Sequence, residues 1–193
     1  MTVTTSAENR PETPAAAIDL PCPSSAGGDA GLTPQRRECC DLRSALGSFA
    51  TGITVITARA DDGEPIGLTI SSFNSVSLDP PLILWSLSVN SPRLEAFRSA
   101  SHYAVNVLAA DQQWLSDRFA GRRNDRFADL PQLAGLGGVP LLEGCSAWFE
   151  CANEAQYPGG DHLIFVGRVE RFAQAESQSP LIFHGGRYRQ LAP

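Results

Sequence analysis

The chain has 193 residues, of which 42% are hydrophobic, and this length and composition predict one globular domain with its own core. The formal net charge is −6 and no run of lysine or arginine exceeds two residues, which argues against a nucleic-acid-binding surface. No apolar stretch approaches the roughly 20 residues that a membrane-spanning helix needs, so we expect no membrane association.

The cysteines and histidines show no metal-binding spacing. The five cysteines contain no CxxC pair, and the three histidines lie far apart in the sequence. We therefore predict no metal site. The N-terminus lacks the charged-then-apolar pattern of a secretion signal, so the sequence favours a reducing, cytoplasmic compartment.

Residues 1–32 are rich in Ala, Pro, Ser, Thr and Gly, a composition that predicts a disordered N-terminal tail. The folded domain is expected over residues 33–193. It opens with a helix, because Thr33 suits an N-cap and Pro34 the first helical position. The apolar face of this helix recurs at spacings of three and four residues, at Leu42, Ala45, Leu46 and Phe49.

The rest of the chain reads mainly as strands. Residues 53–58 and 66–70 flank an Asp-Asp-Gly turn and predict a hairpin. Further strand signals fall at residues 82–87, 103–108, 147–151, 163–169, 181–183 and around Tyr188, with short helices from Ser91 and over 111–119. About seven strands with short connections favour an antiparallel sheet closed into a barrel. Residues 122–144 read as a loop or lid, and Arg122, Arg123 and Arg126 as its solvated charges, although Arg126 and Phe127 could border a site.

Several common nucleotide-binding and hydrolytic motifs are absent. GxGxxG, GxxxxGK[ST], GxSxG and HExxH do not occur in the sequence. A nucleotide cofactor would therefore have to bind outside a Rossmann or P-loop cradle.

Residues 67–81 carry the densest polar pattern. Five hydroxyl residues fall within nine positions, namely Thr69, Ser71, Ser72, Ser75 and Ser77. Serine is unfavourable in strands, so an extended segment of this kind needs hydrogen-bond partners. One interpretation is a polar edge that lies along a planar heterocycle, and the alternative is a serine-rich surface strand.

Three further segments could bind charged or planar groups. Residues 90–93 (Asn-Ser-Pro-Arg) stand at a predicted helix start and suit a phosphate, although an ordinary N-cap with a solvated arginine would look the same. His162 opens a strand after a Pro-Gly-Gly turn, where an imidazole can face a cleft, although a lone histidine is more often structural. Residues 187–189 (Arg-Tyr-Arg) could contact a second nucleotide or simply finish the barrel.

Taken in order, five segments resemble the short-chain flavin reductases of two-component flavin-dependent monooxygenase systems. They are residues 49–57, 67–81, 103–108, 160–167 and 185–188, and the resemblance covers roughly residues 36–192. It implies the FMN-binding split-barrel fold, which is mainly β with a few helices in an antiparallel split β-barrel of Greek-key type. It also implies a homodimer with the flavin near the subunit interface. The sequence departs from the family where it reads Thr-Ile-Ser-Ser-Phe, because many members have Thr-Ala-Asn-Ser-Phe.

The resemblance also implies roles for individual residues. The flavin ring and ribityl chain would contact Thr69, Ile70, Ser71, Ser72, Phe73, Ser75 and Val76. The phosphate end would be held by Asn90, Ser91, Pro92, Arg93 and Leu94 and bordered by Phe119, Ala120 and Gly121. The nicotinamide side would comprise Phe49, Ala50, Thr51, Gly52, His162 and Tyr188. His162 would be the catalytic residue, orienting the nicotinamide or assisting proton balance.

The implied activity is that of an NAD(P)H:flavin oxidoreductase, which reduces FMN or FAD by hydride transfer and supplies free reduced flavin to a partner monooxygenase. NADH is the expected donor, with NADPH as an alternative, and the sequence does not separate FMN from FAD. Three other interpretations stay open: a non-catalytic flavin-binding carrier or sensor of the same fold, a split-barrel oxidase acting on a vitamin-like phosphate, and a barrel that binds no flavin.

Overall fold

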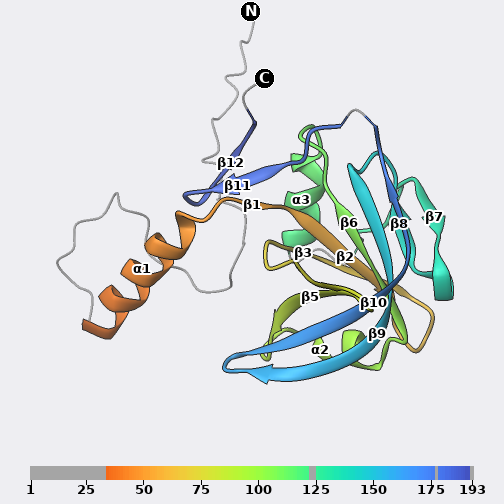
Figure 1. Ribbon diagram of the computed structural model, residues 1–193, viewed down its shortest axis with the longest axis horizontal. Coiled ribbons are helices and arrows are strands. Elements are labelled where there is room, and N and C mark those ends of the chain that lie inside the picture. The colour runs from red at the N-terminus through yellow and green to blue at the C-terminus, as the bar shows by residue number, and fades with distance from the viewer. Residues whose placement is uncertain (1–33, 122–124, 177, 192–193) are drawn as a thin grey trace, which may run out of the picture.

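The computed structural model describes residues 34–121, 125–176 and 178–191, so the predicted tail and the Thr33 N-cap lie outside the described residues. The described chain is mainly β, with antiparallel sheets and three α-helices (Figure 1). The helices are α1 (Pro34–Gly47), α2 (Leu94–Ser99) and α3 (Gln113–Ala120). The strands are β1 (Thr51–Gly52), β2 (Thr54–Arg59), β3 (Pro65–Ile70), β4 (Asn74–Leu78), β5 (Pro81–Ser88), β6 (His102–Val107), β7 (Gln132–Ala134), β8 (Pro140–Leu142), β9 (Ala147–Gly159), β10 (His162–Gln174), β11 (Ile182–His184) and β12 (Arg187–Arg189).

The main sheet has seven antiparallel strands in the order β3-β2-β6-β9-β10-β5-β4. The expected hairpin of β2 and β3 is confirmed, with Thr54 opposite Ile70. The two edge strands, β3 and β4, are consecutive in the chain and are linked only by residues 71–73. Such a link reaches about 14 Å at most, whereas the edges of a flat seven-stranded sheet lie about 29 Å apart. The sheet is therefore curved, and an open seam lies between β3 and β4, which no ladder joins in the described chain.

Strand β2 is buried on both faces and separates two hydrophobic clusters. On one face, Ile56 belongs to a cluster around Trp85, whose ring stacks on Phe165 with 4.2 Å between centroids. On the other face, Val55 packs in a cluster that includes Phe119 of α3. Helix α3 is thereby fixed against the β2–β3 hairpin that leads to the seam.

Two predicted helix starts or ends are wrong in detail. Helix α1 ends at Gly47, so Phe49 lies beyond it. Helix α2 begins at Leu94 with Arg93 as its N-cap, because a turn that follows β5 delays the helix. The hydroxyl of Ser91 therefore caps no helix and instead accepts the N–H of Arg93 at 3.3 Å.

The described chain also has more strands than the seven expected. The short strands β1, β11 and β12 form a small sheet of their own, and the β7–β8 hairpin falls within the predicted loop of residues 122–144. Cys40 is disulfide-bonded, which the cysteine spacing did not predict, whereas Cys39, Cys145 and Cys151 are free thiols. Among the described residues, no helix is both long and apolar enough to cross a membrane.

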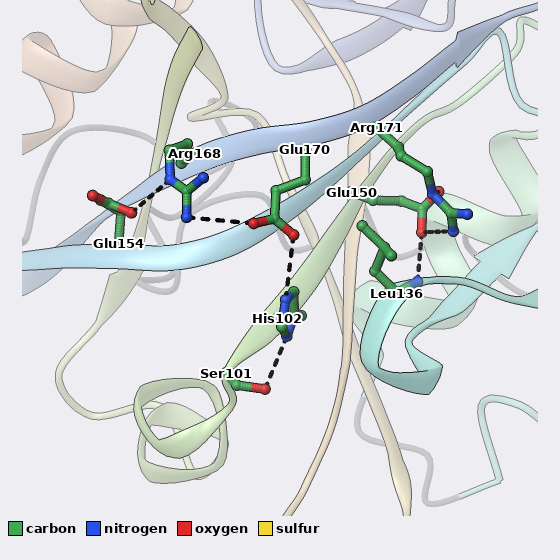
Figure 2. Close-up of polar contacts among 8 residues, drawn as sticks. All are labelled: Ser101, His102, Leu136, Glu150, Glu154, Arg168, Glu170 and Arg171. Atoms are coloured by element: carbon green, nitrogen blue, oxygen red, sulfur yellow. Dashed lines mark hydrogen bonds and ion pairs between the residues drawn. The ribbon is translucent and has the colours of Figure 1, made fainter. Parts of the chain in front are cut away.

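A row of charged side chains ties the turn before β8 to the sheet (Figure 2). Glu150 of β9 accepts two hydrogen bonds from Arg171 of β10, at 3.0 and 2.6 Å, and one from the N–H of Leu136 at 2.6 Å. Burial alone would raise the pKa of Glu150, but these hydrogen bonds and the charge of Arg171 outweigh it, so the pKa is lowered. The row continues along the sheet through Ser101, His102, Glu154, Arg168 and Glu170.

Candidate functional site

The predicted flavin segment begins with the link across the seam. The hydroxyl of Ser72 accepts a hydrogen bond from the N–H of Ser86 at 3.0 Å. It also donates to the carbonyl oxygen of Ser86, at 3.3 Å. Phe73 packs against the core, and Ile70 is buried within it. These three side chains therefore fix the course of the segment, and any contact that they make with a ligand would come mainly from their backbone.

The groups that remain for a ligand lie on either side of this link. In the described part of the chain, the hydroxyls of Ser71 and Ser75 take part in no hydrogen bond. Ser71 is half-buried and Ser75 is exposed on β4, next to the exposed Val76 at a bulge. This donor set fits the predicted contacts with a flavin ring, and those contacts stay a prediction.

Helix α3 connects two of the predicted regions. The hydroxyl of Thr69 donates to the carbonyl of Ser116 at 2.7 Å, and the hydroxyl of Ser116 lies 2.8 Å from that of Tyr188. Tyr188 also donates to the carboxylate of Asp117 at 3.0 Å. Burial, and to a lesser extent the charge of Asp117, raise the pKa of Tyr188 to about 12. The phenol is therefore a fixed donor at neutral pH and joins β12 to the helix that covers β3.

Arg126 is buried between β3 and the end of α3, which corrects the expectation that it belongs to a solvated loop. It is 4% exposed, and its guanidinium donates to the carbonyls of Gly121 and of Gly67, the latter at 3.2 Å. Its Nε is buried without a hydrogen-bond partner. Burial and then the nearby charge of Arg93 lower the pKa of Arg126 to about 10. Arg122 and Arg123 lie outside the described residues.

Aromatic rings pack closely against β3 at the glycine to which Arg126 is bonded. The rings of Phe119 and Phe127 meet edge to face with 5.0 Å between centroids. A Cβ atom on Gly67 would lie 2.7 Å from the Phe119 ring, so only glycine fits at this point of β3. The absent side chain lets both rings and the guanidinium approach the strand. Phe119 itself is buried, and Ala120 and Gly121 next to it are partly exposed.

The predicted phosphate segment forms the turn before α2. Asn90 and Pro92 are exposed, Ser91 holds the turn, and Leu94 packs against the core. Arg93 is half-buried, and burial lowers its pKa. Within the described chain, no carboxylate forms an ion pair with Arg93. The structure thus joins β3 to α3 and to the residue after it through the hydrogen bonds of Thr69 and Arg126. The sequence had placed β3 and the end of α3 in separate predicted segments, and the charge of Arg93, from a third segment, acts on Arg126.

His162 lies beside this turn. It opens β10 opposite Ser88, and the carbonyl of Asp161 accepts the N–H of Val89 at 2.9 Å. The Nδ1 of His162 lies 2.8 Å from the carboxylate of Asp161. The hydrogen bond with His162, together with the charge of that ring, lowers the pKa of Asp161. The carboxylate therefore fixes the orientation of the imidazole.

The structure does not bring the whole predicted nicotinamide side together. Phe49 and Ala50 are exposed and precede β1, in which Thr51 pairs with Phe183, and Phe183 in turn pairs with Tyr188. In Figure 1, this small sheet and the tip of the β9–β10 hairpin that carries His162 lie at different ends of the molecule. No hydrogen bond or ring contact of the described chain joins the two. Their shared role stays a prediction.

Neither a nucleophilic cysteine nor a metal site has support among the described residues. Burial raises the pKa of Cys145 and of Cys151 to about 12, so neither thiol is a nucleophile at neutral pH. No group of three or more His, Cys, Asp or Glu side chains among the described residues is arranged to hold a metal ion.

Comparison with known proteins places the chain in a family. Residues 46–192 match the model of the flavin reductase like domain. The chain belongs to this family. The flavin reductase-like domain spans β1 to β12 and so contains every predicted site residue.

Curated relatives of this flavin reductase-like chain carry related names. The FMN reductase (NADH) SmoA of Agrobacterium fabrum is 50% identical over 152 residues, which cover 78% of this chain and 85% of that protein. The flavin-dependent monooxygenase reductase subunit HsaB of Rhodococcus jostii is 36% identical, with coverage of 86% and 85%. The reductase component of the flavin-dependent trigonelline monooxygenase of Acinetobacter baylyi is 47% identical, but the match covers only 44% of that protein.

Solved structures agree in fold. The NADH:FAD oxidoreductase SgcE6 of Streptomyces globisporus, in complex with NAD and FAD fragments, superposes with a TM-score of 0.78 at 36% identity. The match covers 85% of this chain and 98% of that one. BorF, the flavin reductase component of a bacterial two-component tryptophan halogenase, gives a TM-score of 0.74 at 38% identity, with coverage of 80% and 99%.

Proposed function

We propose that this chain is an NADH-dependent flavin reductase that reduces FMN or FAD and releases the reduced flavin to a separate monooxygenase. The observation that carries the proposal is the hydrogen-bonded contact of β3 with α3 and with Arg126 in a flavin reductase-like domain. Relatives named as an FMN reductase (NADH) and an NADH-dependent flavin reductase support the choice of donor. SgcE6, solved with NAD and FAD fragments, supports the pair of ligands.

The residues of this chain bind the flavin and orient the nicotinamide. Bound flavin supplies a ring that accepts a hydride from the nicotinamide. The free hydroxyls of Ser71 and Ser75 hold the edge of that ring, and Arg93 faces the phosphate end. His162, oriented by Asp161, positions the nicotinamide. Because hydride passes directly between two aligned rings, the main contribution of the protein is alignment, and no acid or base is indispensable.

The finer fold is that of a split barrel. The curvature that the three-residue link between β3 and β4 imposes on the sheet supports this assignment, because a curved sheet with one open seam is a barrel that is not closed. The flavin segment then lies at the opening of the barrel.

The active form is a homodimer. Helix α1 stands apart from the main sheet in Figure 1, with Leu42 and Leu46 each 60% exposed, and Phe49, just beyond the helix, is 72% exposed. An apolar face of this kind supports contact with a second copy of the chain. The predicted nicotinamide side, whose two parts lie apart in one chain, is consistent with a site that a second copy completes. Sedimentation should give the mass of two chains, and a Leu46→Asp variant should shift toward one.

The decisive experiment measures oxidation of NADH and of NADPH with FMN, with FAD or without flavin. We expect turnover that depends on added flavin and is faster with NADH. Tight flavin binding without oxidation of either nucleotide would instead assign the chain as a carrier or sensor. A protein that binds no flavin would overturn the proposal.

A further inference from the structure

Ser116 of α3 is a hydrogen-bonded junction between β3 and β12. The residue is fully buried, and its carbonyl accepts the hydroxyl of Thr69 at 2.7 Å. Its own hydroxyl lies 2.8 Å from that of Tyr188. A phenol has one proton, and Tyr188 donates it to the carboxylate of Asp117 at 3.0 Å. The hydroxyl of Ser116 is therefore the donor in its contact with Tyr188, and a single residue joins strands of two different sheets.

The strand that Ser116 supports has a ladder on one side only. In the described chain, β3 pairs with β2, and its other edge faces the open seam. The hydroxyl proton of Thr69 goes to Ser116, so Thr69 ties this edge strand to α3. Two residues further on, Ser71 begins the link across the seam, and its hydroxyl takes part in no hydrogen bond of the described chain. The position of this free hydroxyl therefore depends on how β3 is held against α3.

Tyr188 of β12 contributes both packing and hydrogen bonds to this junction. Its ring meets that of Phe183 edge to face, with 5.6 Å between centroids. Both rings pack against the cluster that contains Leu115 and Phe119 of α3. Packing sets the place of the phenol ring, and the contact with Ser116 fixes the helix relative to it. Strand β12 thus supports α3 on the same residue that holds β3.

We propose that Ser116 and Tyr188 are positioning residues for the flavin, which act through Thr69 to keep the link of residues 71–73 where the edge of the flavin ring needs it. This proposal rests on the proposed function, because it takes flavin as the ligand of the link. Neither residue has to touch the flavin. Strand β12, which the sequence placed on the nicotinamide side, thereby also sets the affinity for flavin.

The test measures FMN binding in the absence of any nicotinamide nucleotide, by quenching of flavin fluorescence. Ser116→Ala removes the hydroxyl but keeps the carbonyl that Thr69 uses, and Tyr188→Phe keeps the ring. We expect each substitution to weaken FMN binding by about 3- to 10-fold. The double variant should bind FMN no more weakly than the more affected single variant, because both substitutions remove the same contact.

Two further variants serve as controls. Asp117→Asn should bind FMN as the wild type does, because its amide oxygen still accepts the hydrogen bond from the phenol. Ser146→Ala removes another buried serine hydroxyl, one that donates to the carbonyl of Ser179, away from β3 and α3. It should also bind FMN as the wild type does.

A merely structural role for the junction gives a different result. Ser116→Ala and Tyr188→Phe would then lower the Tm while the affinity for FMN stays that of the wild type, and this outcome overturns the proposal. Affinities that fall by independent factors in the double variant also overturn it, because the two residues would not act through one contact. If either variant fails to fold, Thr69→Val decides, because it removes the same junction from the side of β3. Wild-type affinity for FMN in Thr69→Val overturns the proposal.

The positioning role and the proposed function fail separately. If the wild type oxidises NADH with added FMN but the variants bind FMN unchanged, the positioning role is refuted and the reductase stands. If the variants weaken FMN binding as expected but the wild type never oxidises NADH, the positioning role stands and the reductase is refuted. A wild type that binds no flavin refutes both.

Discussion

Replacing Glu150 by Gln should destabilise the protein without touching the flavin site. The side chain of Glu150 is 9% exposed and accepts three hydrogen bonds, two of them from Arg171. Gln keeps the shape but turns an N–H₂ group toward at least one donor. Hydrogen bonds to charged groups contribute about 1.5–3 kcal/mol each, and solvent screens Arg171, which is 55% exposed. We therefore expect a loss of about 2 kcal/mol in the free energy of unfolding, which lowers the Tm by about 4–8 °C.

Thermal unfolding followed by circular dichroism measures this loss. Glu154→Gln is the matched control, because Glu154 makes the same kind of ion pair with Arg168 but both side chains are more than 40% exposed. The control should lose less than about 1 kcal/mol. FMN binding should be the same in the wild type and in both variants, since neither residue contacts β3, α3 or Arg93.

The stabilisation that Glu150 contributes depends on pH in a direction that its lowered pKa determines. The pKa of Glu150 is lowered in the folded state, so the stabilisation is fully present above the unfolded value of about 4.3 and is lost as the pH falls through the folded value. The difference in Tm between wild type and Glu150→Gln should therefore be largest near neutrality and shrink below about pH 4. A constant difference across that range, or a Glu150→Gln variant as stable as the control, would refute the reasoning.

Three further substitutions probe the site. His162→Ala should slow flavin reduction by roughly tens-fold without abolishing it, because alignment suffers while hydride transfer remains, and wild-type rates in stopped-flow kinetics would remove His162 from the site. Gly67→Ala should cost about 1–3 kcal/mol in urea unfolding, because its Cβ would lie 2.7 Å from the Phe119 ring, whereas Gly52→Ala, with open space around its Cβ, should cost less. Tyr188→Phe loses the hydrogen bonds to α3, so we expect about 1 kcal/mol less stability and a higher KM for NADH. An unchanged KM for NADH would show that Tyr188 takes no part in nicotinamide binding.

Local patterns predicted the elements better than their extents. The β-branched run of β2 and the turn after it specify a hairpin in any context, and that hairpin is confirmed. Strands β9 and β10 were both predicted too short, because residues 152–159 and 170–174 carry polar side chains that mark no core. Two of the missed residues pair across the strands, Arg171 with Glu150 and Glu154 with Arg168, and such pairing cannot be read along the sequence.

Arg126 shows where sequence reasoning stops. A segment rich in Arg, Asp and Gly predicts solvent exposure, and nothing in its composition distinguishes a buried arginine from a free one. Arg126 instead donates to the carbonyl of Gly67, nearly 60 positions away, at a point of β3 where the Phe119 and Phe127 rings leave room for no side chain. The one local signal was the Arg126-Phe127 pair itself, which the sequence placed only at the border of a site.

The link of residues 71–73 restricts how this protein can vary. Substitutions in it would change the groups at the predicted flavin site, but an insertion or deletion of one residue would turn every side chain of β4 to the opposite face of the sheet. If the predicted flavin contacts hold, ligand preference can be altered here by exchanging side chains such as Ser71, while the length of the link stays constant.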